Sequence, residues 1–383
     1  MKCKELFARI DELFERYVEI WEEICKIESP TDNKACVDAV GEYVVNIAKE
    51  HGWKIEIHEE KISGNAIAIT MNPNKALAPI VFSAHMDTVH PIGLFGKEPV
   101  RRDEKIIYGP GVLDCKAGIV QSLLAMHALQ SIGFNKRPVM LLLQSDEEVG
   151  SRTSEKRTVK FMCDKAKNAV AFINLEGSSE GYAILERKGI IYYTFNVRGI
   201  EAHAAKCATS GANAIAEAAY KILELEKIKD EWGVTCNCGT IKGGSVPNTV
   251  AGECSFCVNI RYANSRELEW IENRVRKIAE TVYVPGCTTQ LVKLGFRVAM
   301  EHSEKNFALL DKMNEIFVSN GLSALKAGKG TGGSDAADVT AAGIPCVDSL
   351  SATGGEVHSA GEFANIESLR EQTRRIAAVA YCI

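Results

Sequence analysis

Long apolar runs and an excess of positive charge are both absent from this sequence. No stretch approaches the ~20 consecutive apolar residues that a membrane-spanning helix needs. The N-terminal segment MKCKELFARIDELFERY is charged and amphipathic, unlike a secretory signal. The 45 basic and 50 acidic residues are spread along the chain, with a formal net charge of -5 and no basic stripe. We therefore expect neither a membrane nor a nucleic acid as a partner.

Proline is scarce as well, with 10 among 383 residues, and no low-complexity stretch interrupts the chain. The 13 cysteines are an odd number, and they are scattered through predicted helices and strands of a chain that needs no covalent cross-links. They favour a reducing compartment, so we expect a cytoplasmic protein. A chain of 383 residues is too long to fold around one compact core, so we predict two domains of ~100–200 residues each.

Amphipathic segments and short apolar runs alternate in the first part of the chain. Apolar residues recur at three- and four-residue steps from Leu6 to Ile24, which predicts a helix, and a second helix follows it. Runs typical of strands come next at WKIEIHE, NAIAITM, APIVFSA, PVMLLLQS and AVAFINL, with a helix predicted at about residues 116–133. Strands that alternate with helices predict an α/β sheet covered on both faces.

The pattern changes near Arg187. A strand, a helix, two strands, a helix and a strand follow, which is the β-α-β-β-α-β order of the ferredoxin-like split pattern. After about Met300 the alternation of helices and strands returns. We predict a discontinuous larger domain, residues 1–186 and 299–383, and a smaller α+β domain, residues 187–298, inserted into it.

Polar side chains follow the apolar runs, where open α/β sheets place their ligand sites. His85 ends one run and Asp87 stands two residues on, so both side chains point to one side of an extended chain. Such a carboxylate could fix the tautomer and orientation of a metal-binding imidazole. Taken alone, a histidine at a strand end is more often a hydrogen-bonded polar residue than a metal ligand.

Four other loops repeat this placement, and each has a simpler explanation when it is taken alone. Asp114 precedes a predicted helix and could be its N-cap. In QSDEEVGS, adjacent carboxylates repel one another unless a cation or solvent relieves them, and a solvated turn would suffice. Glu176 follows another apolar run in NLEGS, and His358 lies among glycines in GGEVHSAGE. Together, the five loops predict one metal site.

Two histidines and at least three carboxylates suit a pair of borderline or hard divalent ions better than a structural zinc site with thiolate ligands. Two such ions lie ~3.5–4 Å apart, share a bridging carboxylate, and lower the pKa of a water molecule toward ~7. A further carboxylate must take the proton from this water and pass it to the leaving amine. Of the neighbours Glu147 and Glu148, one can face a metal ion and the other the water.

The ordered motifs SAHMDTV, GPGVLDCK, DEEVG, a lone glutamate, the inserted domain, GGSDA and a late histidine span about Ser29 to His358. As a set they resemble the dizinc metallopeptidases of the carboxypeptidase G and aminoacylase family. That family also includes acetylornithine deacetylase, succinyl-diaminopimelate desuccinylase and peptidase T. The resemblance implies a zinc-peptidase-like catalytic domain, with a mixed sheet flanked by helices, and an inserted lid that mediates homodimerisation.

The resemblance also implies a role for each residue of the site and two divalent ions, zinc or else cobalt or manganese. The implied metal ligands are His85 and Glu176 on one ion, Glu148 and His358 on the other, and Asp114 as the bridge. Asp87 would orient His85, and Glu147 would be the general base. The peptide bond that follows Asp114 is expected to be cis.

In the inserted domain, the segment RGIEAHAA matches a family element in which His203 polarises the scissile carbonyl, in dimers that of the partner's site. Asn248 and Arg261 match positions that hold the substrate carboxylate, for which a guanidinium is suited. The glycine-rich loop beside the substrate is matched by Gly332, Gly333 and Ser334. Two departures, Ala117 and Ala205 in place of the usual glycines, affect turns and no ligand.

The implied reaction is hydrolysis of an amide bond in an N-acyl amino acid, or in a short peptide cut from its carboxyl end. Glu176 supports this reading, because in relatives glutamate at this position accompanies carboxypeptidases and deacylases, and aspartate accompanies aminopeptidases. Two alternatives stay open: an aminopeptidase, dipeptidase or tripeptidase that needs a free amino group, and a catalytically idle protein that binds amino acids or peptides. The presence of all five ligands and Glu147 disfavours the idle protein.

Other candidate features have plainer interpretations. Cys236, Cys238, Cys254 and Cys257 have a spacing like a zinc ribbon, but residues three apart on a strand face opposite sides. We interpret Cys115 as a small packed residue. His90 we interpret as an ordinary surface or core histidine.

Overall fold

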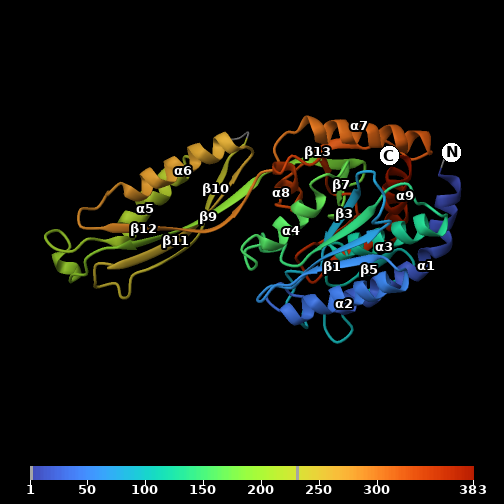
Figure 1. Cartoon of the computed structure of the whole chain (residues 1–383). Helices are drawn as coiled ribbons and strands as arrows, with labels where there is room; N and C mark the ends of the chain where they lie inside the picture. The colour runs from blue at the N-terminus through green and yellow to red at the C-terminus, as the bar shows by residue number, and fades with distance from the viewer. Residues whose placement is uncertain (1–2, 230–232) are drawn as a thin grey trace. The chain divides into compact units, whose positions relative to one another are not determined.

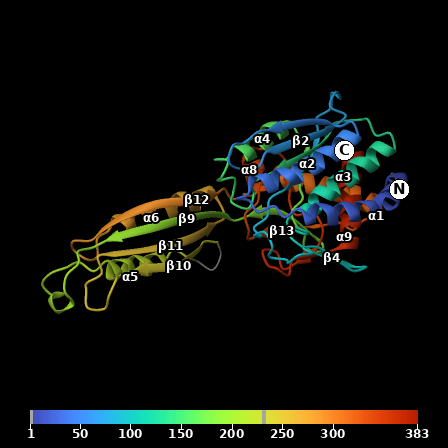
Figure 2. The same cartoon turned by 90° about the horizontal axis from the view of Figure 1, so that it is seen from below.

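The computed structural model describes residues 3–229 and 233–383, which form two compact units. Unit 1 comprises Met1–Glu186, His302–Gly330 and Ser334–Ile383, and unit 2 comprises Arg187–Glu301 and Thr331–Gly333. Figures 1 and 2 show the layers of each unit from two directions. Within the part of the chain that is described, no helix has the length and apolar character needed to cross a bilayer.

Unit 1 is built on a six-stranded mixed sheet, which confirms the predicted fold class of a mixed sheet flanked by helices. Its strands, in spatial order, are β1 (Lys54–His58), β2 (Ala66–Met71), β6 (Val139–Gln144), β3 (Ile80–His85), β7 (Ala171–Asn174) and β14 (Cys346–Val347). The strands β6, β3, β7 and β14 run parallel, whereas β1 and β2 are antiparallel to their neighbours. The central strands are apolar runs because both faces of this sheet are covered.

Helices of unit 1 pack on the sheet and on one another. They are α1 (Lys4–Lys26), α2 (Lys34–Glu50), α3 (Lys116–Ser131), α4 (Arg157–Ala166), α7 (Glu304–Ser319), α8 (Ala336–Ala341) and α9 (Ile366–Cys382). Helix α3 packs on β3 and also against α1 and α9, so nearly all of its side chains are buried and it is apolar on every side. A Cβ at Gly118, in the first turn of α3, would lie 2.5 Å from the carbonyl oxygen of Leu175. Glycine therefore lets the start of α3 approach the end of β7 closely.

A small second sheet in unit 1 joins segments that lie far apart in the sequence. Its order is β15 (Gly354–Gly355), β16 (Phe363–Asn365), β5 (Ile106–Tyr108) and β4 (Arg101–Arg102). Strand β16 pairs antiparallel with β5, with Phe363 opposite Tyr108. The loop that holds His358 is thereby fixed beside the turn that follows Tyr108. A further pair, β8 (Tyr182–Arg187) with β13 (Lys326–Gly330), lies outside both sheets.

Unit 2 is a four-stranded antiparallel sheet with two helices. The order of elements along the chain is β9 (Gly189–Arg198), α5 (Ala214–Leu225), β10 (Thr235–Gly243), β11 (Glu253–Tyr262), α6 (Ser265–Glu280) and β12 (Thr288–Arg297). The spatial order β10-β11-β9-β12 has β10 and β12 at its edges. Buried and less buried residues alternate along β9 and β11, because the two helices share a core with the sheet. The predicted β-α-β-β-α-β order is confirmed.

Candidate metal centre

His85 ends strand β3, and its imidazole is buried. Its Nδ1 lies 2.9 Å from the carbonyl oxygen of Asp87 and 3.4 Å from Asp87 Oδ1. A carbonyl oxygen only accepts hydrogen bonds, so Nδ1 carries the hydrogen. The other nitrogen, Nε2, then faces the remaining candidate ligands, as a metal-binding histidine requires.

The carboxylate of Asp87 is fully buried and binds the backbone of the acidic turn. Its Oδ1 accepts the backbone N–H of Glu147 at 3.2 Å, and its Oδ2 accepts that of Glu148 at 3.2 Å. The hydroxyl of Thr31 donates a third hydrogen bond to it at 2.7 Å. Asp87 thus contacts the histidine at the end of β3 through its backbone carbonyl oxygen, and the acidic turn after β6 through its carboxylate.

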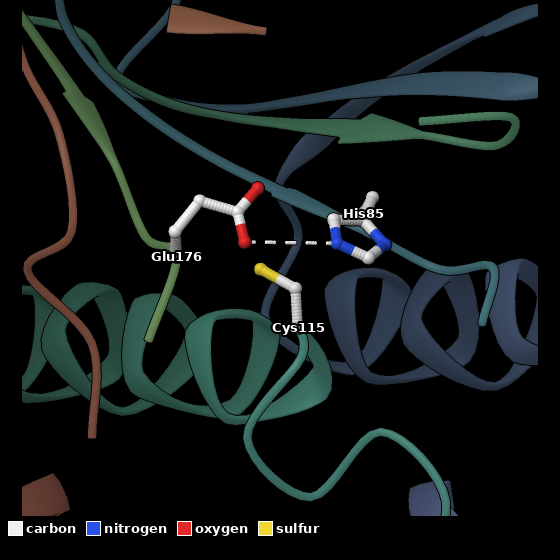
Figure 3. A group of neighbouring side chains, drawn as sticks. All are labelled: His85, Cys115 and Glu176. Carbon is white, nitrogen blue, oxygen red and sulfur yellow. Dashed lines mark ion pairs between the residues drawn. The ribbon is translucent and has the colours of Figure 1, made fainter. Parts of the chain in front are cut away.

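Asp114 lies at the centre of the candidate ligands. Its Oδ1 is 3.0 Å from His85 Nε2, and its Oδ2 is 3.2 Å from His358 Nε2. Glu148 Oε2 lies 3.4 Å from the same nitrogen of His358, and Glu176 Oε2 lies 3.8 Å from His85 Nε2 (Figure 3). The structure therefore brings together all five residues that the sequence nominates as ligands.

The local backbone explains how these side chains converge. The peptide bond between Asp114 and Cys115 is cis, as expected. Gly111 has a φ of 73°, and a Cβ there would lie 2.9 Å from Thr88 Cγ2, so the turn before Asp114 needs glycine. His358 also has a positive φ, 63°, a conformation uncommon outside glycine that concentrates at functional sites.

Several carboxyl groups of the cluster are buried close together, and this shifts their pKa values. Burial raises the pKa of Glu148 to about 8, with Asp114 adding to the shift. Burial also raises the pKa of Glu176 to about 7. Burial alone would raise the pKa of Asp114, but hydrogen bonds from His358 and His85 hold it well below its usual range. Hydrogen bonds to Asp114 and Glu148 in turn raise the pKa of His358 to about 10.

This donor set fits divalent cations. Ligand atoms of His85, Asp114 and Glu148 lie within 4.8 Å of one another, and so do those of His85, Glu176 and Cys115. Figure 3 shows the Cys115 sulfur beside the His85–Glu176 pair. However, its thiol donates to the carbonyl oxygen of Leu175 at 3.0 Å, and burial raises its pKa well above the usual range. Imidazole and carboxylate groups therefore remain the candidate ligands, a set suited to zinc, cobalt or manganese.

The predicted substrate residues lie in other parts of the chain. His203, Asn248 and Arg261 belong to unit 2, as do Gly332 and Gly333. The backbone N–H of Ala204 donates to the carbonyl oxygen of Asn248 at 2.9 Å, so the His203 and Asn248 segments lie side by side. Arg261 donates from Nη1 to the carbonyl oxygen of Thr331, within the glycine-rich loop. The approach of these residues to the metal ligands stays a prediction.

Ser334, by contrast, is buried in unit 1. Its hydroxyl accepts hydrogen bonds from Asn174 Nδ2 at 2.9 Å and from the backbone N–H of Ala336 at 3.2 Å. These contacts tie the end of the glycine-rich loop to strand β7 and to the start of α8. A direct role for Ser334 in substrate binding therefore also stays a prediction.

Sequence reasoning missed a buried glutamate that contacts the turn before Asp114 and the buried histidine that contacts this glutamate. The carboxylate of Glu362 accepts the backbone N–H groups of Leu113 at 2.9 Å and of Asp114 at 3.0 Å. It also accepts a hydrogen bond from His90 Nε2 at 2.6 Å. The only signal in the sequence is an acidic residue in GGEVHSAGE, close behind His358, and nothing local identifies its partner.

Comparisons with known proteins agree with this arrangement. Residues 65–219 match peptidase family M28, and residues 185–287 match the peptidase dimerisation domain. Carboxypeptidase G2 of Pseudomonas sp. (strain RS-16) is 25% identical over 356 residues, covering 91% of this chain and 84% of that protein. Acetylornithine deacetylase of Myxococcus xanthus is 29% identical over 232 residues, which are 57% of each chain. The aminopeptidase PepT structure of Bacillus cereus has a TM-score of 0.78 at 20% identity, covering 96% of this chain and 98% of that one, and establishes a shared fold.

Proposed function

Because the chain belongs to the dizinc metallopeptidase family of carboxypeptidase G, aminoacylase and acetylornithine deacetylase, we propose that it hydrolyses an amide bond with two divalent metal ions. Membership makes it a metal-dependent peptidase or deacylase. Its ligands would be His85 and Glu176 for one ion, Glu148 and His358 for the other, and Asp114 for both. The donor set suits zinc, with cobalt or manganese as substitutes.

The observation that carries this proposal is the position of Asp114. Each of its two carboxylate oxygens faces a different imidazole, at 3.0 Å for His85 and 3.2 Å for His358. A carboxylate shared by two ions needs this arrangement, with one further ligand set on each side. The buried glutamates add the negative charge that would balance two dications.

Each residue around the metal site would have a separate role in hydrolysis. When bound, the two ions would polarise the scissile carbonyl and lower the pKa of a water molecule toward ~7. Glu147 would take a proton from this water as it attacks and deliver it to the leaving amine. Asp87 holds the backbone of Glu147 and the ring of His85 in fixed orientation. His203 would donate to the carbonyl oxygen as negative charge develops there.

We propose an N-acyl amino acid, or a short peptide trimmed from its carboxyl end, as the substrate. Arg261 and Asn248 would bind the free carboxylate of the leaving amino acid, since a guanidinium matches a carboxylate with paired hydrogen bonds. Two sequence relatives are a carboxypeptidase and a deacetylase, which supports this class. Glu176 at its ligand position supports it as well.

We further propose a cytoplasmic homodimer that forms through unit 2. Helix α5 contacts β10, an edge strand of the sheet, and apolar side chains of both elements are exposed. Ile215, Tyr220, Leu223 and Ile241 are between 40% and 62% exposed. Two copies could cover these side chains and pair their edge strands. Leu223→Glu should then produce a monomer by light scattering, and an unchanged mass would contradict this interface.

The function is tested by loading the protein with Zn²⁺, Co²⁺ or Mn²⁺ and assaying N-acyl amino acids, dipeptides and tripeptides. We expect turnover of substrates whose amino group is blocked and whose carboxylate is free. Activity that requires a free amino group would identify an aminopeptidase instead. A metal-loaded protein that binds these compounds but hydrolyses none would be a binding protein.

A further inference from the structure

We propose that Glu362 is a positioning residue for Asp114 and that His90 orients Glu362 for this task. The inference rests on the proposed function, in which Asp114 is the carboxylate shared by both ions. Glu362 would act through the backbone of the turn that carries this ligand. It would not bind a metal ion or the substrate itself.

Both carboxylate oxygens of Glu362 accept backbone donors of one turn. Oε1 accepts the N–H of Leu113 at 2.9 Å and that of Asp114 at 3.0 Å, and Oε2 accepts the N–H of Gly111 at 3.4 Å. Glu362 is fully buried, where hydrogen bonds to an ionised group are strong. The carboxylate thereby fixes the backbone from which the Asp114 side chain extends.

His90 completes the hydrogen bonding of Glu362. Its Nε2 lies 2.6 Å from Glu362 Oε2, and its ring is buried. Phe95 covers this ring edge to face, with 5.0 Å between ring centroids. The loop that carries His90 begins at His85 and Asp87, so one segment supplies a candidate ligand, its orienting carboxylate and the partner of Glu362.

The small sheet explains why Glu362 can reach this turn. Strand β5 leads directly into residues 109–114, and β16 begins immediately after Glu362. The pairing of these strands continues past Tyr108, where the N–H of Gly109 donates to the carbonyl oxygen of Glu362 at 3.3 Å. Glu362 also follows closely behind His358. A single residue therefore ties the turn of the predicted bridging ligand to the loop of another ligand.

Such a tie matters because a shared carboxylate must meet two ions at once. A displacement of ~1 Å in a catalytic group can cost roughly a hundredfold in rate. Residues that orient metal ligands typically affect metal affinity or activity by ~10–100-fold when replaced. We therefore expect replacement of Glu362 to weaken metal binding, although Glu362 is not itself a proposed ligand.

The test measures metal affinity first, because affinity does not depend on knowing a substrate. Glu362→Gln and His90→Gln are titrated with Zn²⁺ against a chelator, at a temperature where circular dichroism finds them folded. In Glu362→Gln, glutamine keeps the shape of the glutamate side chain and loses its charge. In His90→Gln, the imidazole that donates to Glu362 is lost. In both variants the dissociation constant should rise by about 10–100-fold. The exposed residues Glu367 and His302 provide matched controls, since Glu367→Gln and His302→Gln should bind Zn²⁺ like the unaltered protein.

Kinetics and a double replacement separate positioning from a general loss of stability. At saturating Zn²⁺, Glu362→Gln should lower kcat and leave KM within about twofold, because the substrate contacts are unaltered. In an Asp114→Asn background, Glu362→Gln should change Zn²⁺ affinity by less than about twofold, since both changes act on one ligand. Independent, multiplicative effects would overturn the proposal.

Two further outcomes are decisive. Unchanged Zn²⁺ affinity in folded Glu362→Gln would also overturn the proposal. If Glu362→Gln does not fold, His90→Gln carries the test, because it leaves the carboxylate in place. An unaltered protein that binds two Zn²⁺ ions tightly and hydrolyses no amide would contradict the proposed function alone, and the effect of Glu362 on affinity would still be measurable.

Discussion

Each of the two units contains a buried glutamate that accepts at least two backbone N–H groups, but the anchored segments differ. In unit 2, Glu217 on α5 accepts hydrogen bonds from Tyr283 at 2.9 Å and Val284 at 2.6 Å. Its carboxylate also pairs with Lys221 at 3.1 Å. Lys221 donates to carbonyl oxygens at the end of α6, including Ile278 at 2.8 Å. The Glu217–Lys221 pair therefore supplies hydrogen-bond partners to the C-terminal end of α6 and to the turn that follows it.

In unit 1, the donors to Glu362 belong to the turn that carries Asp114, and its side-chain partner is a histidine. The chemistry of the two carboxylates is the same: a buried charge is tolerated when hydrogen bonds satisfy it. The anchored segments differ: the one in unit 1 carries a proposed metal ligand, Asp114, and the one in unit 2 carries none of the proposed ligands. We therefore expect changes at Glu217 and Lys221 to affect folding, and changes around Asp114 to affect metal binding and catalysis.

The largest effect should come from Glu147→Ala in unit 1. Loss of a general base should lower kcat by about 10²–10⁴-fold. Metal content should stay near that of the unaltered protein, because Glu147 is not a proposed ligand. Metal analysis alongside steady-state kinetics checks both points, with Glu104→Ala, an exposed glutamate of the same unit, as the control. Parallel loss of metal and activity would identify Glu147 as a ligand.

Lys221→Met should give the strongest effect in unit 2, on stability. It removes one partner of a fully buried ion pair and leaves the Glu217 carboxylate uncompensated, which typically costs about 3–5 kcal/mol. Chemical denaturation measures this loss. Lys229→Met, at the surface pair with Glu226, should leave the free energy of unfolding nearly unchanged, because solvent screens an exposed ion pair. A large fall in Zn²⁺ affinity in folded Lys221→Met would contradict the expectation that changes at this pair affect folding and not metal binding.

The sequence predicts the parts of this protein that depend on local patterns. Apolar runs gave the strands of both main sheets, and the polar residues behind them included His85 and Glu176. The small sheet was missed because strands of two or three residues, such as β5 and β16, carry no readable periodicity. Partnerships across the chain were missed for a related reason: His90 and Glu362 lie 272 residues apart. His90 resembles an ordinary histidine in the sequence because its neighbours there do not identify its partner.

Arg261→Ala tests whether unit 2 also contributes to the substrate site. Hydrogen bonds to a charged group contribute about 1.5–3 kcal/mol, so KM should rise roughly 10–100-fold for substrates with a free carboxylate. The same substrates in amidated form should be affected little. Arg266→Ala, at an exposed position at the start of α6, is the matched control. An equal rise in KM for amidated substrates would contradict the assignment of Arg261.

A pH dependence of metal binding is expected in unit 1 alone. Glu176 and Glu148 have pKa values raised to about 7 and about 8, and that of His358 is raised to about 10, so these groups hold protons near neutral pH. A cation must displace those protons, and Zn²⁺ affinity should therefore rise with pH, by roughly tenfold per pH unit for each proton released. Chelator competition at pH 6, 7 and 8 measures this slope, and calorimetry in buffers of different ionisation enthalpy counts the protons. Lys221→Met should leave the slope unaltered, because its pair lies in the other unit, whereas a flat profile would contradict the proposed ligand set.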